Sequence, residues 1–165
     1  MKKYSVVAVI AAVVLVLDQL TKWYVRQTVS LYESIAVIDS LFNITHVRNT
    51  GGAFSLFAGS SQAVRLPFFL LMSMIAVVVL LVFVRRVRPE QRLLLFALGA
   101  ILGGALGNFV DRLVYGEVTD FLDFHWHGYY WPAFNVADSC ITTGMLILLF
   151  YSLLVHDEAD DRLRA

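Results

Sequence analysis

The stretch GALGNFVDRLVYGEVTDFLDFHWHGYYWPAFNVADSC, residues 104–140, combines polar side chains with long apolar runs on both of its sides. It holds Asp111, Asp120, Asp123 and Asp138 within one short part of the chain. An ionisable group at the edge of a hydrocarbon layer is costly to keep there, so such groups are candidates for function. We therefore expect the rest of the chain to position these aspartates.

The composition indicates a membrane protein. Of the 165 residues, 59% are hydrophobic and only 16% are charged, and the mean hydropathy is +0.71. A soluble domain of this length could not bury so much apolar surface. The formal net charge of zero gives no electrostatic footprint for nucleic acid. The single cysteine, Cys140, excludes an internal disulfide and a dithiol redox pair.

Four segments are long and apolar enough to span a bilayer, which predicts an all-α membrane protein with four transmembrane helices. We expect these helices at about residues 4–24, 66–84, 93–115 and 135–155. Each has about 20 residues, which at a rise of about 1.5 Å per residue crosses a hydrocarbon core of roughly 30 Å. Residues 1–165 then form a single membrane-embedded domain, and the charged tail after residue 155 is expected to be loose.

The placement of lysine and arginine predicts the orientation of the chain. Most of these residues fall on the side of the two termini: Lys2, Lys3, Arg85, Arg86, Arg88, Arg92, Arg162 and Arg164. Because cytoplasmic connections carry an excess of Lys and Arg, we expect both termini in the cytoplasm. The connections at residues 25–65 and 116–134 then lie on the outer side. We expect Arg26, Arg48 and Arg65 in loops of that side.

The first outer connection predicts a small β-sheet at about residues 30–60. Residues 41–49 are rich in β-favouring side chains, two glycines follow at Gly51 and Gly52, and a second apolar run occupies residues 53–57. A strand, a glycine turn and a second strand are therefore expected, forming a platform on the outer membrane surface. The glycines would permit close approach of a substrate backbone, which the platform could clamp through main-chain hydrogen bonds.

Small residues recur along the third predicted helix. Gly99, Gly103 and Gly107 are spaced four residues apart and lie on one helix face. Such a face lets a neighbouring helix backbone approach closely. We interpret these glycines as packing residues within the molecule, and their role is to fix where the outer end of this helix lies.

Two charged pairs stand near the outer ends of the helices. Asp18 and Lys22 are one helical turn apart in the first helix, and we expect them to support the fold rather than to react. Asp111 and Arg112 end the third helix and could form another internal salt bridge. The guanidinium fork of Arg112 would also suit binding of carbonyl or carboxylate oxygens.

Asp120 and Asp138 are the strongest candidates for chemistry. Asp120 follows the third helix on the outer side, and Asp138 lies in the first turns of the fourth helix, which enters from the same side. Either one could simply favour a helix N-terminus. Two carboxylates about 3 Å apart share one proton, and the pKa of one of them rises. The ionised partner can then take a proton from water while the protonated partner polarises a scissile carbonyl.

Other chemistries are less consistent with the sequence. It contains neither G-x-S-x-G for a serine nucleophile nor H-E-x-x-H for zinc. His125 and His127 alternate with tryptophan in an aromatic stretch, which favours an interfacial position over a metal site. We therefore predict no metal and no cofactor.

An alternative function is a small four-helix proton-coupled transporter subunit. In it, Asp18, Asp111, Asp120 and Asp138 would form a proton relay. A relay should distribute its acids across the depth of the membrane, whereas these four fall near the outer end. The clustering therefore favours an aspartic hydrolase that acts at the membrane interface.

Five motifs follow one another along nearly the whole chain: Asp18-Gln19-Leu20-Thr21-Lys22, Arg48-Asn49-Thr50-Gly51-Gly52-Ala53-Phe54, Gly103-Gly104-Ala105-Leu106-Gly107-Asn108 with Asp111-Arg112, Val118-Thr119-Asp120-Phe121, and Phe134-Asn135-Val136-Ala137-Asp138-Ser139. In this order they resemble the signal peptidase II family, the bacterial inner-membrane aspartic proteases that process lipoproteins. The common order makes the resemblance far more specific than any one motif.

The resemblance implies roles for these residues. Asp120 and Asp138 would form the catalytic dyad, with Asp18 and Lys22 as support. The residues expected to line the substrate cleft are Asn49, Asn108, Arg112 and Asn135. The substrate would be a prolipoprotein with a diacylglyceryl-modified cysteine, cut just before that cysteine. The family is inhibited by globomycin, a cyclic peptide that occupies the dyad. The active site would lie near the periplasmic side of the bacterial inner membrane.

Overall fold

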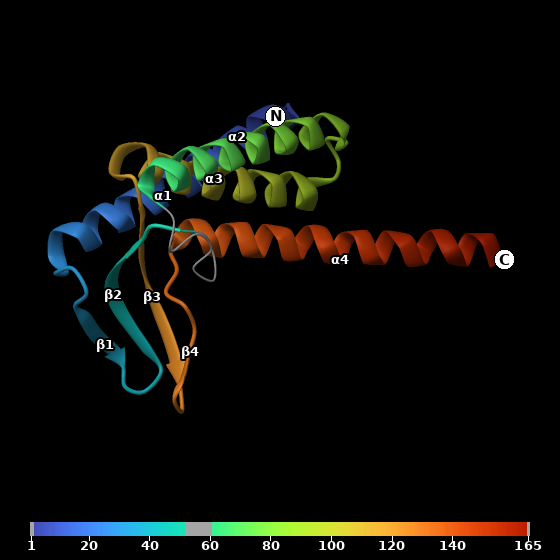
Figure 1. Cartoon of the computed structure of the whole chain (residues 1–165). Coiled ribbons are helices and arrows are strands. Elements are labelled where there is room, and N and C mark those ends of the chain that lie inside the picture. The colour runs from blue at the N-terminus through green and yellow to red at the C-terminus, as the bar shows by residue number, and fades with distance from the viewer. Residues whose placement is uncertain (1, 52–60, 165) are drawn as a thin grey trace.

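The computed structural model describes residues 2–51 and 61–164, with side chains described up to residue 154. Within these residues the chain forms four long helices and one antiparallel sheet, as Figure 1 shows. The helices are α1 (Lys3–Thr28), α2 (Gln62–Arg86), α3 (Arg92–Tyr115) and α4 (Val136–Arg164). The strands are β1 (Ser34–Ile38), β2 (Phe42–Asn49), β3 (Val118–Trp126) and β4 (Tyr129–Tyr130). The predicted fold class is confirmed.

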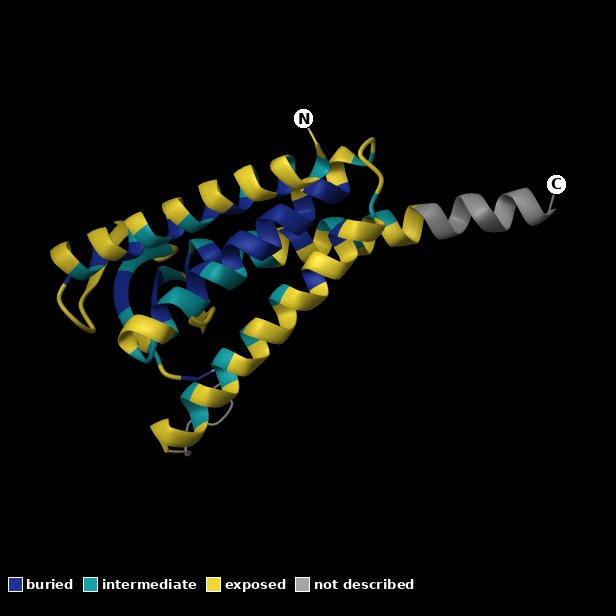
Figure 2. Ribbon diagram, turned by 90° about the horizontal axis from the view of Figure 1, so that it is seen from above, coloured by how far each residue is buried: buried dark blue, intermediate teal, exposed yellow. Residues whose placement is uncertain are grey.

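Helix α3 is the central helix and packs against α1, α2 and α4. Figure 2 shows the buried residues gathered inside the bundle, while the outer faces of the surrounding helices are exposed. In the most apolar window of α3, 61% of the residues are buried, against 6% in that of α2. All four helices are long and apolar enough to cross a membrane. The exposed apolar side chains of the outer helices therefore suit contact with lipid.

Close contact between helices depends on the glycines of α3. A Cβ atom on Gly103 would lie 2.6 Å from the carbonyl oxygen of Ala11 and 2.7 Å from the Cβ of Val14 in α1. A Cβ atom on Gly104 would lie 2.5 Å from the carbonyl oxygen of Ala137 in α4. The expected packing role is confirmed, and α3 uses adjacent glycines to contact two different helices.

The sheet lies at one end of the bundle and extends sideways from it (Figure 1). Its strand order is β1-β2-β3-β4, and all neighbouring strands are antiparallel. Strand β2 comes from the first outer connection and β3 from the second, with Val47 opposite Asp120 and Asn49 opposite Val118. The pairing therefore joins the two connections and places Asp120 beside the end of β2.

A small sheet is present in the predicted region, and β2 is the predicted first strand, but β1 and β3 were not expected as strands. The predicted second strand at residues 53–57 lies outside the described residues. Residues 118–126 alternate in side-chain direction, so that Leu122 and Phe124 share one face with Asp120. The sequence did not predict this strand, because its aromatic residues are also typical of a loop at the membrane interface.

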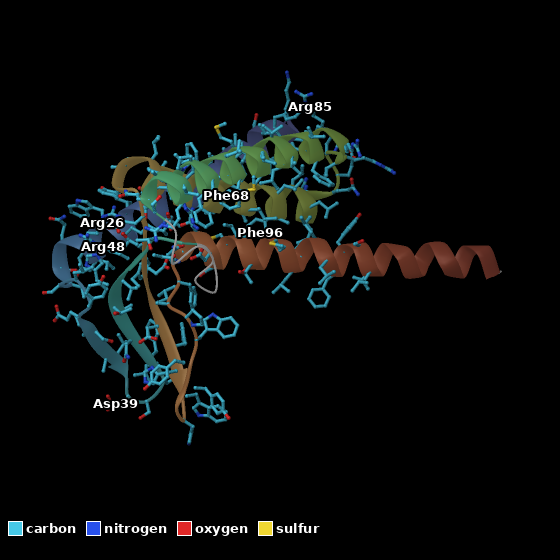
Figure 3. All side chains as sticks on the ribbon, in the orientation of Figure 1. Arg26, Asp39, Arg48, Phe68, Arg85 and Phe96 are labelled. Carbon is cyan, nitrogen blue, oxygen red and sulfur yellow. The ribbon has the colours of Figure 1, made fainter. Side chains whose placement is uncertain are left out.

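The opposite end of the bundle joins α1 to the α2–α3 turn. The Lys3 ammonium donates to the carbonyl oxygens of Arg85 and Val87 at 2.8 and 2.9 Å. Figure 3 places Arg85 at this end, far from Arg26 and Arg48 at the sheet end. The ammonium thus satisfies carbonyl groups that the end of α2 leaves without helical partners.

Two details differ from the expected boundaries. Helix α4 continues to Arg164, although residues after 155 were expected to be loose; they contain neither Gly nor Pro and several good helix formers. Arg26 and Arg65 belong to helices α1 and α2, and Arg48 to β2, rather than to loops. The helices extend further than their apolar cores because polar residues at helix ends can reach water.

A leucine at position 103 tests the close α1–α3 contact. We expect Gly103→Leu to lower the free energy of unfolding by about 1–3 kcal/mol or more, because the new side chain meets the α1 backbone. Thermal unfolding in detergent micelles measures this loss. Ala12→Leu on the exposed face of α1 is the matched control and should unfold near the wild-type temperature. Equal stability of the two variants would contradict the packing described.

Candidate active site

Asp138 is held by the first turn of α4. Asn135 precedes the helix, and its Oδ1 accepts a hydrogen bond from the backbone N–H of Asp138 at 2.9 Å. The Oδ2 of Asp138 accepts from the backbone N–H of Asn135 at 3.3 Å. This reciprocal arrangement is a capping box, with Asn at the cap and Asp three positions later. The helix cap therefore also fixes the direction of the Asp138 carboxyl group.

Asp120 reaches the same place from β3. Its side chain is buried, with the residue only 2% exposed. Its Oδ1 accepts from the Asn135 Nδ2 at 2.6 Å, and its Oδ2 accepts from the Asn49 Nδ2 at 2.9 Å. Asn135 thus hydrogen-bonds to both Asp120 and Asp138. The strand and the helix are joined through one asparagine.

The environment of Asp120 favours its protonated form. Burial, and next the negative charge of Asp138, raise the pKa of the Asp120 carboxyl to about 7 from its ordinary value of 3.8. The N–H donors of Asn49 and Asn135 lower it, but by less than burial raises it. At neutral pH this residue can therefore either donate or accept a proton.

A compensated cluster of charges lies beneath the two aspartates. The Lys22 ammonium is fully buried and lies 2.8 Å from the Asp18 Oδ2 and 3.3 Å from the Asp111 Oδ2. The Arg26 Nη1 lies 3.6 Å from the Asp111 Oδ1. The cluster contains both signs of charge, as buried ion pairs require. The supporting role expected for Asp18, Lys22 and Asp111 agrees with these contacts.

The cluster also binds the elements that carry Asp120 and Asp138. The Oδ1 of Asp18 accepts from the backbone N–H of Ala137 at 2.9 Å, at the first turn of α4. The Oδ2 of Asp111 accepts from the backbone N–H of Thr119 at 3.0 Å, next to Asp120. Each supporting carboxylate therefore fixes the backbone directly before one of the two site aspartates.

Asp111 and Arg112 do not form the salt bridge with each other that the sequence suggested. Asp111 pairs with Lys22 and Arg26, because its side chain faces α1. The Arg112 guanidinium lies over the Phe69 ring, 5.1 Å from its centroid, and its Nη1 donates to the Asn108 carbonyl oxygen at 3.2 Å. Adjacent helical residues point in different directions, which separates the two side chains.

A cavity of about 830 Å³ opens in front of the two aspartates. Its lining includes both of them together with Asn49, Gly51, Asn108 and Arg112. It continues along α4 past Ile141, Thr142 and Thr143. Asn135, Asp18, Lys22 and Asp111 are fully buried and lie behind this lining. The structure thus brings the predicted residues together in two layers, one lining the cavity and one supporting it.

Sequence reasoning missed several supporting residues. The side-chain amide nitrogen of Gln19, Nε2, donates to the Asp111 Oδ1 at 3.1 Å and to the Gly107 carbonyl oxygen at 3.1 Å. The Arg26 Nη1 donates to the Thr119 Oγ1 at 3.0 Å. Arg26 follows Lys22 by four residues, a spacing that places both on one helix face and could have indicated its role.

Each of the two histidines in the second outer connection lies against an aromatic ring. His125 stacks on Tyr130, and His127 lies against Trp126. In the part of the chain that the structure describes, no group of three His, Cys, Asp or Glu side chains could hold a metal ion.

Comparison with known proteins identifies the family. The model of the family described as signal peptidase (SPase) II matches residues 10–154. The chain belongs to the signal peptidase II family. The resemblance carried by the five sequence motifs is therefore confirmed, and the chain is a member of a family of membrane proteases.

Individual signal peptidase II relatives are similar along most of their length. The lipoprotein signal peptidase of Geobacter sulfurreducens is 54% identical over 134 residues, which cover 81% of this chain and 82% of that protein. That of Desulforapulum autotrophicum is 48% identical over 142 residues, covering 86% and 88%. A bacterial membrane enzyme solved by the in meso method at 1.9 Å is 34% identical, with a TM-score of 0.79 and coverage of 89% and 92%. A second, solved at 2.3 Å, is 33% identical with a TM-score of 0.78 and coverage of 93% and 90%.

The raised pKa of Asp120 makes stability depend on pH. Between about pH 4 and about pH 7 the folded protein keeps a proton on Asp120 that the unfolded chain releases. The folded state then binds more protons, so the contribution of Asp120 to stability falls as the pH rises through this range. We expect the wild type to lose stability relative to Asp120→Asn across it, measured by thermal unfolding in detergent. Parallel pH curves for the two proteins would contradict the raised pKa.

The supporting role of Asp18 is tested by its amide. Asp18→Asn leaves the buried Lys22 with one charged partner fewer, and removal of one partner of a buried pair costs about 3–5 kcal/mol. We expect a clearly lower unfolding temperature in detergent. Asp123→Asn is the matched control, because Asp123 is half-buried and accepts a hydrogen bond from Asn43 at 3.2 Å. An Asp18→Asn protein as stable as the control would argue against the support.

Proposed function

We propose that this protein is an aspartic endopeptidase that removes signal peptides from prolipoproteins, with Asp120 and Asp138 as its catalytic dyad. The observation that carries this proposal is that two carboxyl groups from β3 and α4 line one cavity and share hydrogen bonds with Asn135. Family membership supports the peptidase activity and the prolipoprotein substrate. The arrangement of the two aspartates supports the finer claim about mechanism.

The two aspartates take different roles in this mechanism. Asp120, whose pKa lies near 7, carries the proton and donates a hydrogen bond to the oxygen of the scissile carbonyl. Asp138, which accepts N–H donors from Asn108 and Asn135, acts as the general base and takes a proton from the attacking water. The water oxygen bonds to the carbonyl carbon and forms a tetrahedral intermediate. Asp138 then passes the proton that it took from water to the amide nitrogen. The C–N bond breaks and gives a carboxylic acid and an amine.

The position of the cavity suits a substrate that arrives from the bilayer. The cavity is lined by residues of the sheet and of α3 and α4, among them the exposed Thr142 and Thr143. A peptide whose cysteine carries diacylglycerol could keep its acyl chains along this apolar helix while its backbone reaches Asp120 and Asp138. The cut would fall just before the modified cysteine.

Asn49 and Gly51 form the wall of the cavity on the sheet side. The Asn49 Oδ1 accepts from the Gly51 N–H at 3.0 Å, so this N–H is occupied within the protein. A main-chain clamp on the substrate would therefore use other backbone groups of this wall. Arg112, at the opposite wall, has donors that can bind carbonyl oxygens of the substrate.

The charge distribution supports an active site on the periplasmic side of the bacterial inner membrane. Arg85 lies at the end of the bundle opposite the sheet (Figure 3). Lys3 hydrogen-bonds to its carbonyl oxygen, and Lys2 and Arg86 are the neighbours of these two residues in the chain. An excess of Lys and Arg marks the cytoplasmic side, so this end, with both chain termini, would face the cytoplasm. The sheet and the cavity would then lie at the outer surface.

Cleavage by dyad variants tests the proposal. Asp120→Asn and Asp138→Asn should each reduce cleavage of a purified diacylglyceryl-modified prolipoprotein by at least about 100-fold, because each removes one acid–base partner. Asp123→Asn is the control, because Asp123 lies in β3 like Asp120. This variant should cleave at a rate near that of the wild type. Globomycin should inhibit the wild type. Near-wild-type cleavage by either dyad variant would overturn the dyad assignment.

A further inference from the structure

The side-chain amide of Asn108 can adopt only one orientation. Its Oδ1 accepts from the Lys22 ammonium at 2.9 Å, and its Nδ2 donates to the Asp138 Oδ1 at 2.8 Å. An ammonium group can donate but cannot accept, and a carboxylate can accept but cannot donate. A flipped amide would place N–H against ammonium and oxygen against carboxylate. The ammonium therefore directs the amide donor of Asn108 at Asp138.

Two other asparagines are oriented in the same way but by the backbone. The Asn135 Oδ1 accepts from the Asp138 N–H, and the Asn49 Oδ1 accepts from the Gly51 N–H. Their Nδ2 groups donate to the two oxygens of Asp120. In all three asparagines a fixed donor holds the oxygen, so that the NH₂ group faces the aspartates. Asn108 differs from the other two because its fixed donor is a side chain that substitution can remove.

Lys22 is well placed to hold this orientation. It is fully buried, and the carboxylates of Asp18 and Asp111 at 2.8 and 3.3 Å restrict its ammonium. The α1 backbone that carries it lies against the glycine face of α3, the helix that carries Asn108. The ammonium thus cannot move away from Asn108 without leaving both of its charged partners.

We infer that Lys22 is a positioning residue, which orients the Asn108 amide and thereby keeps an N–H donor on Asp138, the residue proposed to accept a proton from water. This inference rests on the proposed dyad. It adds to the supporting role already described, because it assigns to Lys22 an effect on the protonation of a residue that it does not contact. Without the ammonium, the Asn108 Oδ1 keeps only the longer hydrogen bond from the Asn135 Nδ2, at 3.3 Å, so the amide is held less firmly. An amide that turns its oxygen toward Asp138 favours a protonated carboxyl group there.

Other charged groups also act on Asp138 and must stay constant in a test. Asp18 comes from α1, Arg112 and Asp111 from α3, Asp120 from β3, and Arg48 lines the same cavity from β2. A comparison of two substitutions at position 22 leaves all of these unchanged. Lys22→Met cannot donate to Asn108, whereas Lys22→Gln keeps an amide N–H. Both remove the same positive charge.

The test is made in the Asp18→Asn background, so that the loss of the ammonium does not leave both of its carboxylate partners unpaired. In this background Asp111 keeps Arg26 as a partner, 3.6 Å away. The pH dependence of kcat/KM is measured with a diacylglyceryl-modified prolipoprotein for the parent, the Met variant and the Gln variant. We expect the acidic limb of the Met profile to move to higher pH by about one pH unit, as the loss of a hydrogen bond to a charged acceptor would cause. The Gln profile should stay close to that of the parent.

A measurement without substrate separates this inference from the proposed function. Infrared difference spectra during a pH titration follow the protonated carboxyl band of Asp138, assigned as the band that is lost in Asp138→Asn. The Met variant should hold this proton to higher pH than the Gln variant, whether or not the protein cleaves prolipoproteins. Identical titration of the two variants would overturn the role of Lys22, even if the dyad itself is correct. Cleavage by Asp120→Asn would overturn the dyad but not this result.

Discussion

The structure depends on one buried ammonium group with partners on two helices. Lys22 of α1 contacts Asp18 on its own helix, and Asp111 and Asn108 on α3. Through Asp18 it is connected to the first turn of α4, and through Asp111 to the start of β3. Removing a charge from water is costly, and the cost is offset only while all of these acceptors stay in place. The position of the site therefore follows from the requirement to satisfy this single cation.

The charges of the protein are arranged in two layers with different properties. The lower layer pairs carboxylates with Lys22 and Arg26, and in it Asp18, Lys22 and Asp111 are fully buried. In the upper layer, Asp120 and Asp138 have amide donors as their hydrogen-bond partners. In this layer, burial raises the pKa of Asp120 to about 7. The same residue type thus stabilises the fold in one layer and, in the proposed mechanism, transfers protons in the other.

Much of the fold and the site could be predicted from the sequence, because their signals are local. Apolar runs indicated the four helices, the spacing of Gly99, Gly103 and Gly107 indicated close packing, and the motifs indicated the site residues. Strand β3 could not be recognised, because its pairing partner lies in a distant connection and its aromatic residues suit an interface as well. The partner of Asp111 was equally inaccessible, since only the packing of α1 on α3 decides between Arg112 and Lys22. Sequence patterns indicate which residues matter, but contacts between helices decide what each of them touches.

The double task of Asn135 has a consequence for inhibitor resistance. This residue caps α4, bridges to Asp120 and accepts from Asp138, so most substitutions there would damage helix, strand and site at once. If an inhibitor binds to the groups that Asn135 positions, few substitutions at residue 135 could weaken its binding and still leave a folded protein. Thr142 lines the same cavity from an exposed position of α4, so a substitution there would change the cavity with less damage to the fold.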